Sequence, residues 1–185
     1  MKSGALILAA GASKRLGVPK QLVCLGNETL LDRSVRIAGE AGCAPVVVVL
    51  GAFEELIRQQ CRLKDALILS NPDWKEGMGT SLSLGIRAFA DVAGVVVMTC
   101  DMPAVTAGHL RALATSDAAT ASSYAGRKGV PAYFLPDSFP ELRKLQGDAG
   151  ARELLRTANA IELTGGELDI DTNGDLSRAQ KMFSS

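Results

Sequence analysis

The chain has 185 residues, of which 47% are hydrophobic, and its 20 basic and 20 acidic side chains cancel to a formal net charge of zero. This length suits a single domain, residues 1–185, that buries about 70% of the surface of its unfolded chain. The charge balance argues against a general surface for nucleic acid or membranes, so we expect small-molecule partners bound at a specific site.

Cysteine spacing and the start of the chain indicate a cellular compartment. The four cysteines form no CxxC pair, which predicts reduced and mostly buried thiols in a cytosolic protein. The hydrophobic run at residues 5–10 is too short for a signal peptide or a membrane span. We therefore expect a cytoplasmic protein.

Short apolar runs alternate with stretches of helical periodicity along the first hundred residues. The runs predicted as strands are residues 5–9, 45–50, 66–69 and 94–100. The stretches predicted as helices are residues 29–41, 54–61 and 81–89, the first of which starts with Thr29 and Asp32 spaced as in a capping box. This alternation predicts an α/β fold with a doubly wound, mostly parallel, Rossmann-like sheet.

The pattern changes after residue 115. Two strand-like stretches flank a turn at residues 126–129, which predicts a small hairpin excursion from the sheet. Beyond it we expect helices at residues 137–145, 149–157 and 175–183, and a short strand at 168–170.

The first predicted strand runs directly into a basic loop that contains glycine. Gly11 and Gly17 allow the backbone to turn tightly and to approach a ligand. Three positive charges follow within ten residues, on Lys14, Arg15 and Lys20. These features predict a phosphate-binding loop. It is neither a Walker A loop nor a dinucleotide-binding GxGxxG loop, because both require glycine where the chain has Leu16.

Carboxylates follow two of the predicted extended segments. The strand at 94–100 ends on Asp101, at the edge of a parallel sheet where ligands bind, so that its carboxylate could hold Mg²⁺ on a triphosphate. The alternative is that Asp101 only caps the next turn. Near the end of the chain, Asp169 and Asp171 would share one face of an extended segment, and one of them could complete the metal site. The alternative there is an acidic start to the last helix.

A third segment, residues 71–82, is a glycine-rich turn that leads into a helix N-terminus, where backbone N–H groups can bind a base edge or a phosphate. His109, the only histidine, is predicted to be a surface residue of a helix. Because no second histidine or suitably placed cysteine accompanies it, a catalytic triad is not supported.

These motifs together resemble the nucleotidyltransferase family, and more closely the branch with the molybdenum cofactor cytidylyltransferases. Residues 8–20 resemble the signature Leu-Ala-Ala-Gly-x-Ser-x-Arg-Met/Leu-Gly-x-x-Lys, and residues 71–81 resemble Asn-Pro-x-Trp-x-x-Gly-Met-x-x-Ser. Residues 129–134 and 147–152 are similar to two segments that mark the branch. Two positions depart from the family pattern: Gly79, where serine is frequent, and Val130, where histidine or asparagine is common.

The resemblance implies a fold similar to that of the nucleotide-diphospho-sugar transferases and a Mg²⁺-dependent reaction. In it, the phosphate of molybdopterin attacks the α-phosphorus of CTP and releases pyrophosphate. The residues implied in nucleotide binding are Leu8, Ala9, Ala10, Gly11, Ser13, Arg15, Lys20, Gly77, Met78 and Ser81. Those implied in catalysis are Arg15, Lys20 and Asp101, and the metal ligands are Asp101 with Asp169 or Asp171. Those implied for the second substrate are Gly129, Pro131, Asp148 and Arg152.

Three alternatives remain beside this reading. One is the guanylyltransferase for the same cofactor. Ala10 argues against it, since guanylyltransferases tend to show Leu-Ala-Gly-Gly at the start of the loop, with glycine where this chain has Ala10. Another is a nucleotidyltransferase that acts on a sugar or polyol phosphate. The third is a non-catalytic chaperone that delivers molybdenum cofactor to an apo-enzyme of the xanthine dehydrogenase type.

Overall fold

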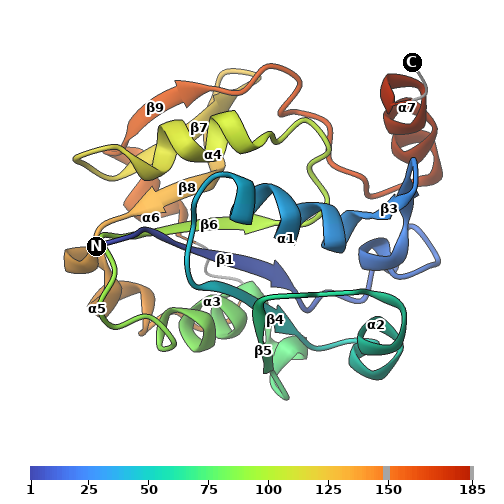
Figure 1. The fold of residues 1–185 in the computed structure, drawn as a ribbon, viewed down its shortest axis with the longest axis horizontal. Helices are drawn as coiled ribbons and strands as arrows, with labels where there is room; N and C mark the ends of the chain where they lie inside the picture. The colour runs from blue at the N-terminus through green and yellow to red at the C-terminus, as the bar shows by residue number, and fades with distance from the viewer. Residues whose placement is uncertain (148–150, 184–185) are drawn as a thin grey trace.

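The structure, a computed structural model, describes residues 1–147 and 151–183. Its main strands are β1 (Gly4–Ala9), β4 (Val46–Leu50), β5 (Ala66–Ser70), β6 (Val95–Thr99), β7 (Thr120–Tyr124), β8 (Arg127–Phe134) and β9 (Asn159–Glu162). They form one seven-stranded sheet in the order β5-β4-β1-β6-β8-β7-β9 (Figure 1). A separate two-stranded hairpin joins β2 (Cys24–Leu25) to β3 (Glu28–Thr29).

The helices are α1 (Leu30–Glu40), α2 (Glu54–Gln60), α3 (Met78–Ile86), α4 (Ala107–Ala114), α5 (Phe139–Leu142), α6 (Arg152–Arg156) and α7 (Asn173–Phe183). Short 3-10 turns occupy Lys20–Leu22, Trp74–Glu76 and Pro136–Ser138. Helices α1 and α4 pack on one face of the sheet, and α3, α5 and α6 pack on the other (Figure 1). The predicted doubly wound α/β fold is thereby confirmed.

Four adjacent strands, β5, β4, β1 and β6, are parallel. Three of them, β4, β1 and β6, are buried along almost their whole length, which explains why their sequences are continuous apolar runs. Leu8 lies opposite Thr99 in the register of β1 and β6. The loop after β1 and the loop after β6 therefore leave the sheet side by side.

The second half of the sheet departs from the predicted pattern in two places. The hairpin turn consists of Ala125 and Gly126, both with positive φ (47° and 73°), and β8 begins at Arg127 rather than after residue 129. Two successive turn residues with positive φ give the twist that matches the paired strands of a two-residue hairpin. The predicted strand at 168–170 is not a strand; the seventh strand is β9, whose side chains are mostly exposed and give no apolar pattern.

Several predicted helices have different bounds. Helix α3 begins at Met78, three residues earlier than predicted, directly after Gly77 with its φ of 126°. The helix predicted at 137–145 is a 3-10 turn followed by the short α5, and the one predicted at 149–157 is described only as α6. Only glycine readily adopts the φ of 126° found at residue 77, so Gly77 fixes where α3 starts.

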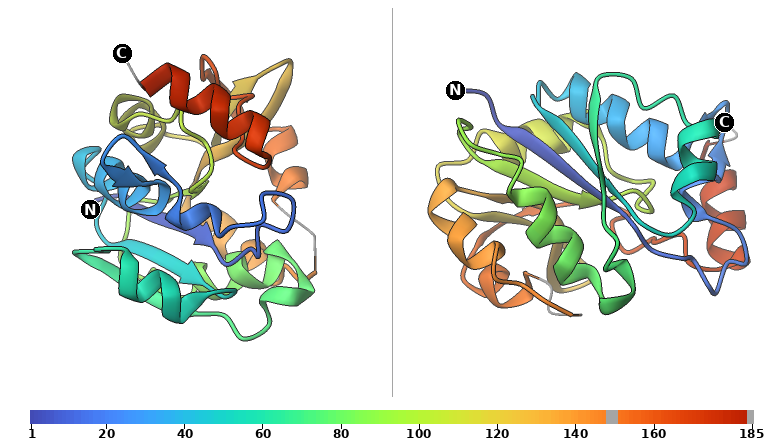
Figure 2. Two further views of the ribbon diagram at one scale, coloured as in Figure 1. Left: turned by 90° about the vertical axis from the view of Figure 1, so that its right-hand side faces the viewer. Right: turned by 90° about the horizontal axis from the view of Figure 1, so that it is seen from below.

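A small third core packs the basic loop after β1 against the segment near the end of the chain. It contains Leu16, Val23, Leu25, Leu30, Leu168, Ile170 and Ala179. In Figure 2 (right) α7 and the first loop of the chain lie at the same end of the molecule. The backbone N–H of Ile170 donates to the carbonyl of Asp101 over 2.9 Å, which ties the segment before α7 to the end of β6.

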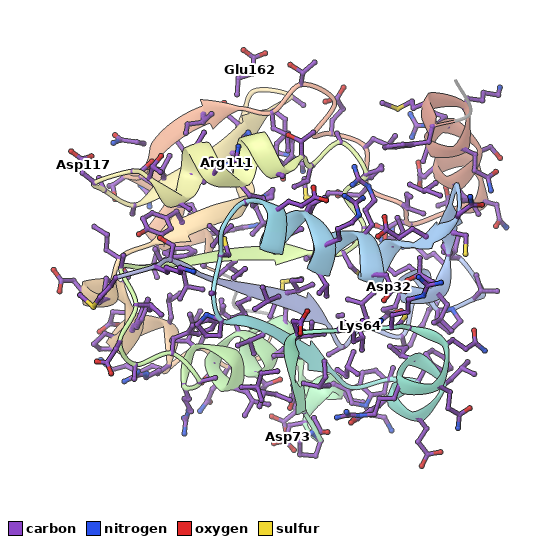
Figure 3. All side chains as sticks on the ribbon, viewed as in Figure 1. Asp32, Lys64, Asp73, Arg111, Asp117 and Glu162 are labelled. Atoms are coloured by element: carbon purple, nitrogen blue, oxygen red, sulfur yellow. The ribbon has the colours of Figure 1, made fainter. Side chains whose placement is uncertain are left out.

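Helix α1 is capped as its sequence predicts. Thr29 accepts a hydrogen bond from the backbone of Asp32, which lies in the first turn of α1 (Figure 3). The Asp32 carboxylate accepts two more from the backbone N–H groups of Arg62 and Leu63. The cysteines are free thiols, three of them buried and Cys24 exposed. None of the helices in the described residues has the length and apolar character needed to span a membrane.

Candidate active site

Four charged side chains from three distant segments meet at the carboxyl end of the sheet. The Lys20 ammonium donates to Asp101 Oδ2 over 2.7 Å and to Asp171 Oδ1 over 2.6 Å. The Arg15 guanidinium donates to the other oxygen of Asp171 over 2.6 Å. The structure thus brings together the two cations assigned to catalysis and two of the three carboxylates that the sequence singles out.

Lys20 stays charged in this arrangement. Burial lowers the pKa of its ammonium, but the charge of Asp101 and the hydrogen bonds to Asp101 and Asp171 outweigh burial and raise the pKa above its usual value. The side chains of Lys20 and Asp101 are only 16% and 15% exposed, whereas Arg15 is 72% exposed. Lys20 is therefore a fixed internal charge, whereas Arg15 is paired with Asp171 at the exposed rim, where a ligand can reach it.

The loop between β1 and Lys20 is held by polar contacts of its own. Ser13, at a positive φ of 50°, accepts a hydrogen bond from the backbone N–H of Lys20 over 3.0 Å. Gln21 is almost fully buried and donates to the carbonyls of Ala9 and Gly11 over 2.7 and 3.0 Å. Sequence reasoning missed Gln21, because nothing in the sequence distinguishes it from a solvated polar residue. Its effect is to fix the loop on which the predicted nucleotide contacts lie.

Asp169 and Asp171 lie on either side of the buried Ile170, as the alternation along an extended segment requires. Burial, followed by the negative charges of Asp101 and Asp171, raises the pKa of Asp169 to about 6. The three carboxylates therefore interact electrostatically, while only two of them contact Lys20.

We expect Asp169→Asn to stabilise the protein at neutral pH when EDTA is present. The folded pKa of about 6 lies above the ordinary 3.8, so the folded protein binds a proton that the unfolded chain has lost, and the free energy of unfolding falls as the pH rises through this window. The variant removes that loss. Thermal melting should show a gain above about pH 6.5 that shrinks toward about pH 4.

Asp171→Asn is the matched control, because it removes a carboxylate that holds both Lys20 and Arg15. It should lower the melting temperature at neutral pH. If the wild type and Asp169→Asn had the same melting temperature across the whole pH range, the raised pKa of Asp169 would be contradicted.

The segment before α3 lies next to the basic loop. A Cβ on Gly51, after β4, would come within 2.6 Å of Trp74 Cβ and 3.0 Å of Ala10 Cβ, so the lack of a side chain there lets both residues pack against the Gly51 backbone. Met78 is half exposed, but Ser81 is buried and accepts a hydrogen bond from Asn71 Nδ2 over 2.9 Å. Gly77 and Met78 are therefore available to a ligand, whereas the Ser81 hydroxyl has a partner inside the protein.

The residues predicted for the second substrate are spread over β8 and the start of α6. Gly129 and Pro131 lie in β8, with Gly129 the more accessible of the two, and Arg152 is an exposed residue at the start of α6. Asp148 lies outside the described residues. The expectation for His109 was wrong: it is half buried, and its Nε2 lies 2.7 Å from Ser122 Oγ. Burial lowers the pKa of His109, so it packs between α4 and the sheet as a neutral side chain.

The carboxylates are suited to a hard cation that is shared with a substrate. Asp101 Oδ1 is buried and has no hydrogen-bond partner among the described residues. No group of three His, Cys, Asp or Glu side chains in residues 1–147 and 151–183 is arranged to hold a metal without further ligands. Magnesium is usually bound by one or two carboxylates together with substrate phosphates, which fits a pair of aspartates beside a phosphate-binding loop.

A cavity of about 470 Å³ lies elsewhere, along the outer side of α3. Its lining includes Asn71, Thr80, Arg87 and Arg143 but none of the charged residues around Lys20. It is separate from the ion-paired site.

A sheet with this strand order, a basic loop after β1 and aspartates after β6 and before α7 define a protein of the nucleotidyltransferase class. A profile of the MobA-like NTP transferase domain matches residues 5–163. The chain belongs to this family, which confirms the resemblance deduced from its motifs.

Known relatives carry different names. One from Paenarthrobacter nicotinovorans, 32% identical over 96% of this chain and 93% of its own length, is named nicotine blue oxidoreductase. One from Escherichia coli K12, 25% identical over 96% and 95% of the two chains, is named molybdenum cofactor cytidylyltransferase. A crystal structure of Rv0371c from Mycobacterium tuberculosis, described as a complex with manganese, has a TM-score of 0.80 and 26% identity over 98% of this chain and 99% of its own.

Proposed function

We propose that the protein transfers CMP from CTP to the phosphate of molybdopterin and releases pyrophosphate. The observation that carries this proposal is the Lys20 ammonium, which is bound by Asp101 and Asp171 beside the loop after β1. The name of the Escherichia coli relative supports the choice of substrates. We further propose that the product is received by an apo-molybdoenzyme of the xanthine dehydrogenase type.

The chain's own residues have positioning and electrostatic roles in this reaction. The loop from Leu8 to Ser13 would bind the nucleotide, and Arg15 and Lys20 would neutralise the charge that builds on the α-phosphate and the leaving pyrophosphate. Lys20 is already oriented by its two carboxylates, so its charge needs little reorganisation during the reaction. Because a phosphate monoester is itself an anionic nucleophile, no side chain has to act as a general base.

Asp101, with Asp169 or Asp171, would hold Mg²⁺, and the ion would supply positive charge to the phosphate oxygens. The buried Asp101 Oδ1, which has no hydrogen-bond partner among the described residues, supports this role.

We expect CTP to raise the melting temperature more than GTP does, because Ala10 stands where guanylyltransferases tend to have glycine. The methyl group of Ala10 is buried against the Gly51 backbone and therefore has a fixed position at the start of the loop. A thermal-shift screen with each NTP and Mg²⁺ checks this. A clear preference for GTP would move the assignment to the guanylyltransferase.

Turnover decides between an enzyme and a carrier. Pyrophosphate release on mixing the protein with CTP, Mg²⁺ and molybdopterin is the expected result. A chaperone would bind the cofactor without releasing pyrophosphate. Redox turnover without pyrophosphate release would instead favour an oxidoreductase activity, as the name of the Paenarthrobacter relative indicates for that protein.

A further inference from the structure

The tip of the β7–β8 hairpin carries a cation stacked on an aromatic ring. Tyr124 and Arg127 are the last paired residues before the two-residue turn, and the Arg127 guanidinium lies 5.3 Å from the centre of the Tyr124 ring. Because β8 runs antiparallel to β6, its first residues lie at the edge of the sheet where β6 ends. The hairpin tip therefore extends past the end of the strand that leads to Asp101.

The Tyr124 ring is held from several sides. Its hydroxyl donates to the carbonyl of Val130 over 3.1 Å. A Cβ on Gly129 would come within 2.3 Å of that hydroxyl, and a Cβ on Gly166 would come within 2.8 Å of the ring. Both glycines thus leave the room that the ring fills. A ring fixed in this way gives the guanidinium above it a defined orientation.

Tyr124 also lies within the electrostatic reach of the carboxylates. Burial raises the pKa of its hydroxyl, the charge of Asp169 adds to the increase, Arg127 opposes it, and the charge of Asp101 adds a smaller contribution. The stacked pair and the carboxylates consequently belong to one electrostatic environment.

Among the described residues no carboxylate forms an ion pair or a hydrogen bond with Arg127, although its positive charge opposes the rise in the pKa of Asp169. Its side chain is exposed, and its guanidinium stacks on the Tyr124 ring. The next residue differs: the Lys128 ammonium donates to the carbonyls of Ala158 and Arg156 over 2.6 and 3.2 Å. Of these two neighbouring cations, only Arg127 is available to an incoming anion.

In the order of the sheet, Asp101 lies between two separate cationic groups. Arg15 and Lys20 lie on the β1 side, and Arg127 lies on the β8 side. The proposed reaction involves two anionic groups, a triphosphate and a phosphate monoester, that must meet near Asp101. A guanidinium with a free edge is well suited to bind a phosphate through two hydrogen bonds.

We propose that Arg127, oriented by Tyr124, binds the phosphate monoester of the acceptor substrate. This inference rests on the proposed function and deepens it, since it assigns the acceptor phosphate to the hairpin and leaves the nucleotide phosphates to the loop after β1. Neither residue was singled out for binding from the sequence, because Arg127 was expected within a turn.

The test is a fluorescence titration of the full chain with 6-hydroxymethylpterin phosphate and with unphosphorylated 6-hydroxymethylpterin, both in Mg²⁺ buffer. The wild type should bind the phosphorylated pterin more tightly. Arg127→Ala should weaken that binding by roughly 10- to 100-fold, which is the loss in affinity expected when charge-assisted hydrogen bonds to the phosphate are removed. The affinity for the unphosphorylated pterin should not change. Arg127→Lys should restore part of the loss, and the thermal shift with CTP should stay unchanged.

Lys128→Ala serves as the matched control, because it removes a neighbouring charge of the same hairpin without altering the stacked pair. Equal affinity of the wild type for the two pterins, or equal losses in Arg127→Ala and Lys128→Ala, would overturn the inference. The proposed function fails separately: if the wild type released no pyrophosphate from CTP and molybdopterin but bound the phosphorylated pterin through Arg127, the acceptor site would stand and the transfer reaction would be wrong.

Discussion

Replacing Lys20 with alanine is expected to lower turnover by roughly 10²–10³-fold, with a smaller change in CTP affinity. The ammonium is fixed by Asp101 and Asp171 before any substrate binds, so it costs little reorganisation when charge develops on the transferring phosphate. Its removal also leaves two carboxylates without the cation between them. The variant should therefore lose more electrostatic stabilisation of the transition state than of the bound ground state.

Lys14→Ala is the control for Lys20→Ala, because Lys14 is an exposed cation of the same loop. If Lys20 were only one of several solvated charges, both variants would show a modest, salt-sensitive loss of CTP binding with turnover intact. Steady-state kinetics at two salt concentrations separates these outcomes. Equal and small effects at the two positions would rule out a catalytic role for Lys20.

A second readout does not depend on turnover. In Lys20→Ala, Asp101 and Asp171 should repel each other, so that Mg²⁺ alone should raise the melting temperature by more than it does in the wild type. An unchanged response to Mg²⁺ would show that these carboxylates do not hold the ion.

The first half of the fold could be predicted because three of its four main strands are buried on both faces. β1, β4 and β6 are almost continuously apolar, and the first helix between them, α1, has a clear period and a Thr29 cap. β9 could not be predicted, since it lies at the edge of the sheet and is stabilised by pairing with β7 rather than by burial. The hairpin turn was misplaced because Ala125, which adopts a positive φ, carries no local signal for that conformation.

Asp101 was found from the sequence because it ends an apolar strand, and Arg15 and Lys20 because they lie in the basic loop that follows another apolar strand. What the sequence did not reveal is how they pair. Lys20 was assigned to phosphates and Asp101 to a metal, and the structure shows the two bound to each other. That contact joins residues 81 positions apart, and it depends on the small core around Ile170 that brings the segment before α7 to the end of β6.

Asp101→Asn is expected to reduce activity by roughly 10²–10³-fold while the protein still folds. The asparagine has nearly the same shape, and Lys20 keeps its ion pair with Asp171. The backbone carbonyl of residue 101, which accepts from Ile170, is unaffected by the change. What disappears is the negative charge at the buried Oδ1, the atom that no group in the described residues satisfies.

The measurement is turnover across a range of Mg²⁺ concentrations, beside circular dichroism and thermal melting to verify the fold. If Asp101 holds the ion, excess Mg²⁺ should recover only part of the activity, and Mg²⁺ should no longer raise the melting temperature of the variant in the presence of CTP. Asp169→Asn and Asp171→Asn, tested singly, should show which of the two carboxylates shares the role. Near-normal rates of Asp101→Asn at every Mg²⁺ concentration would remove Asp101 from the metal site and leave its ion pair with Lys20 as a structural contact.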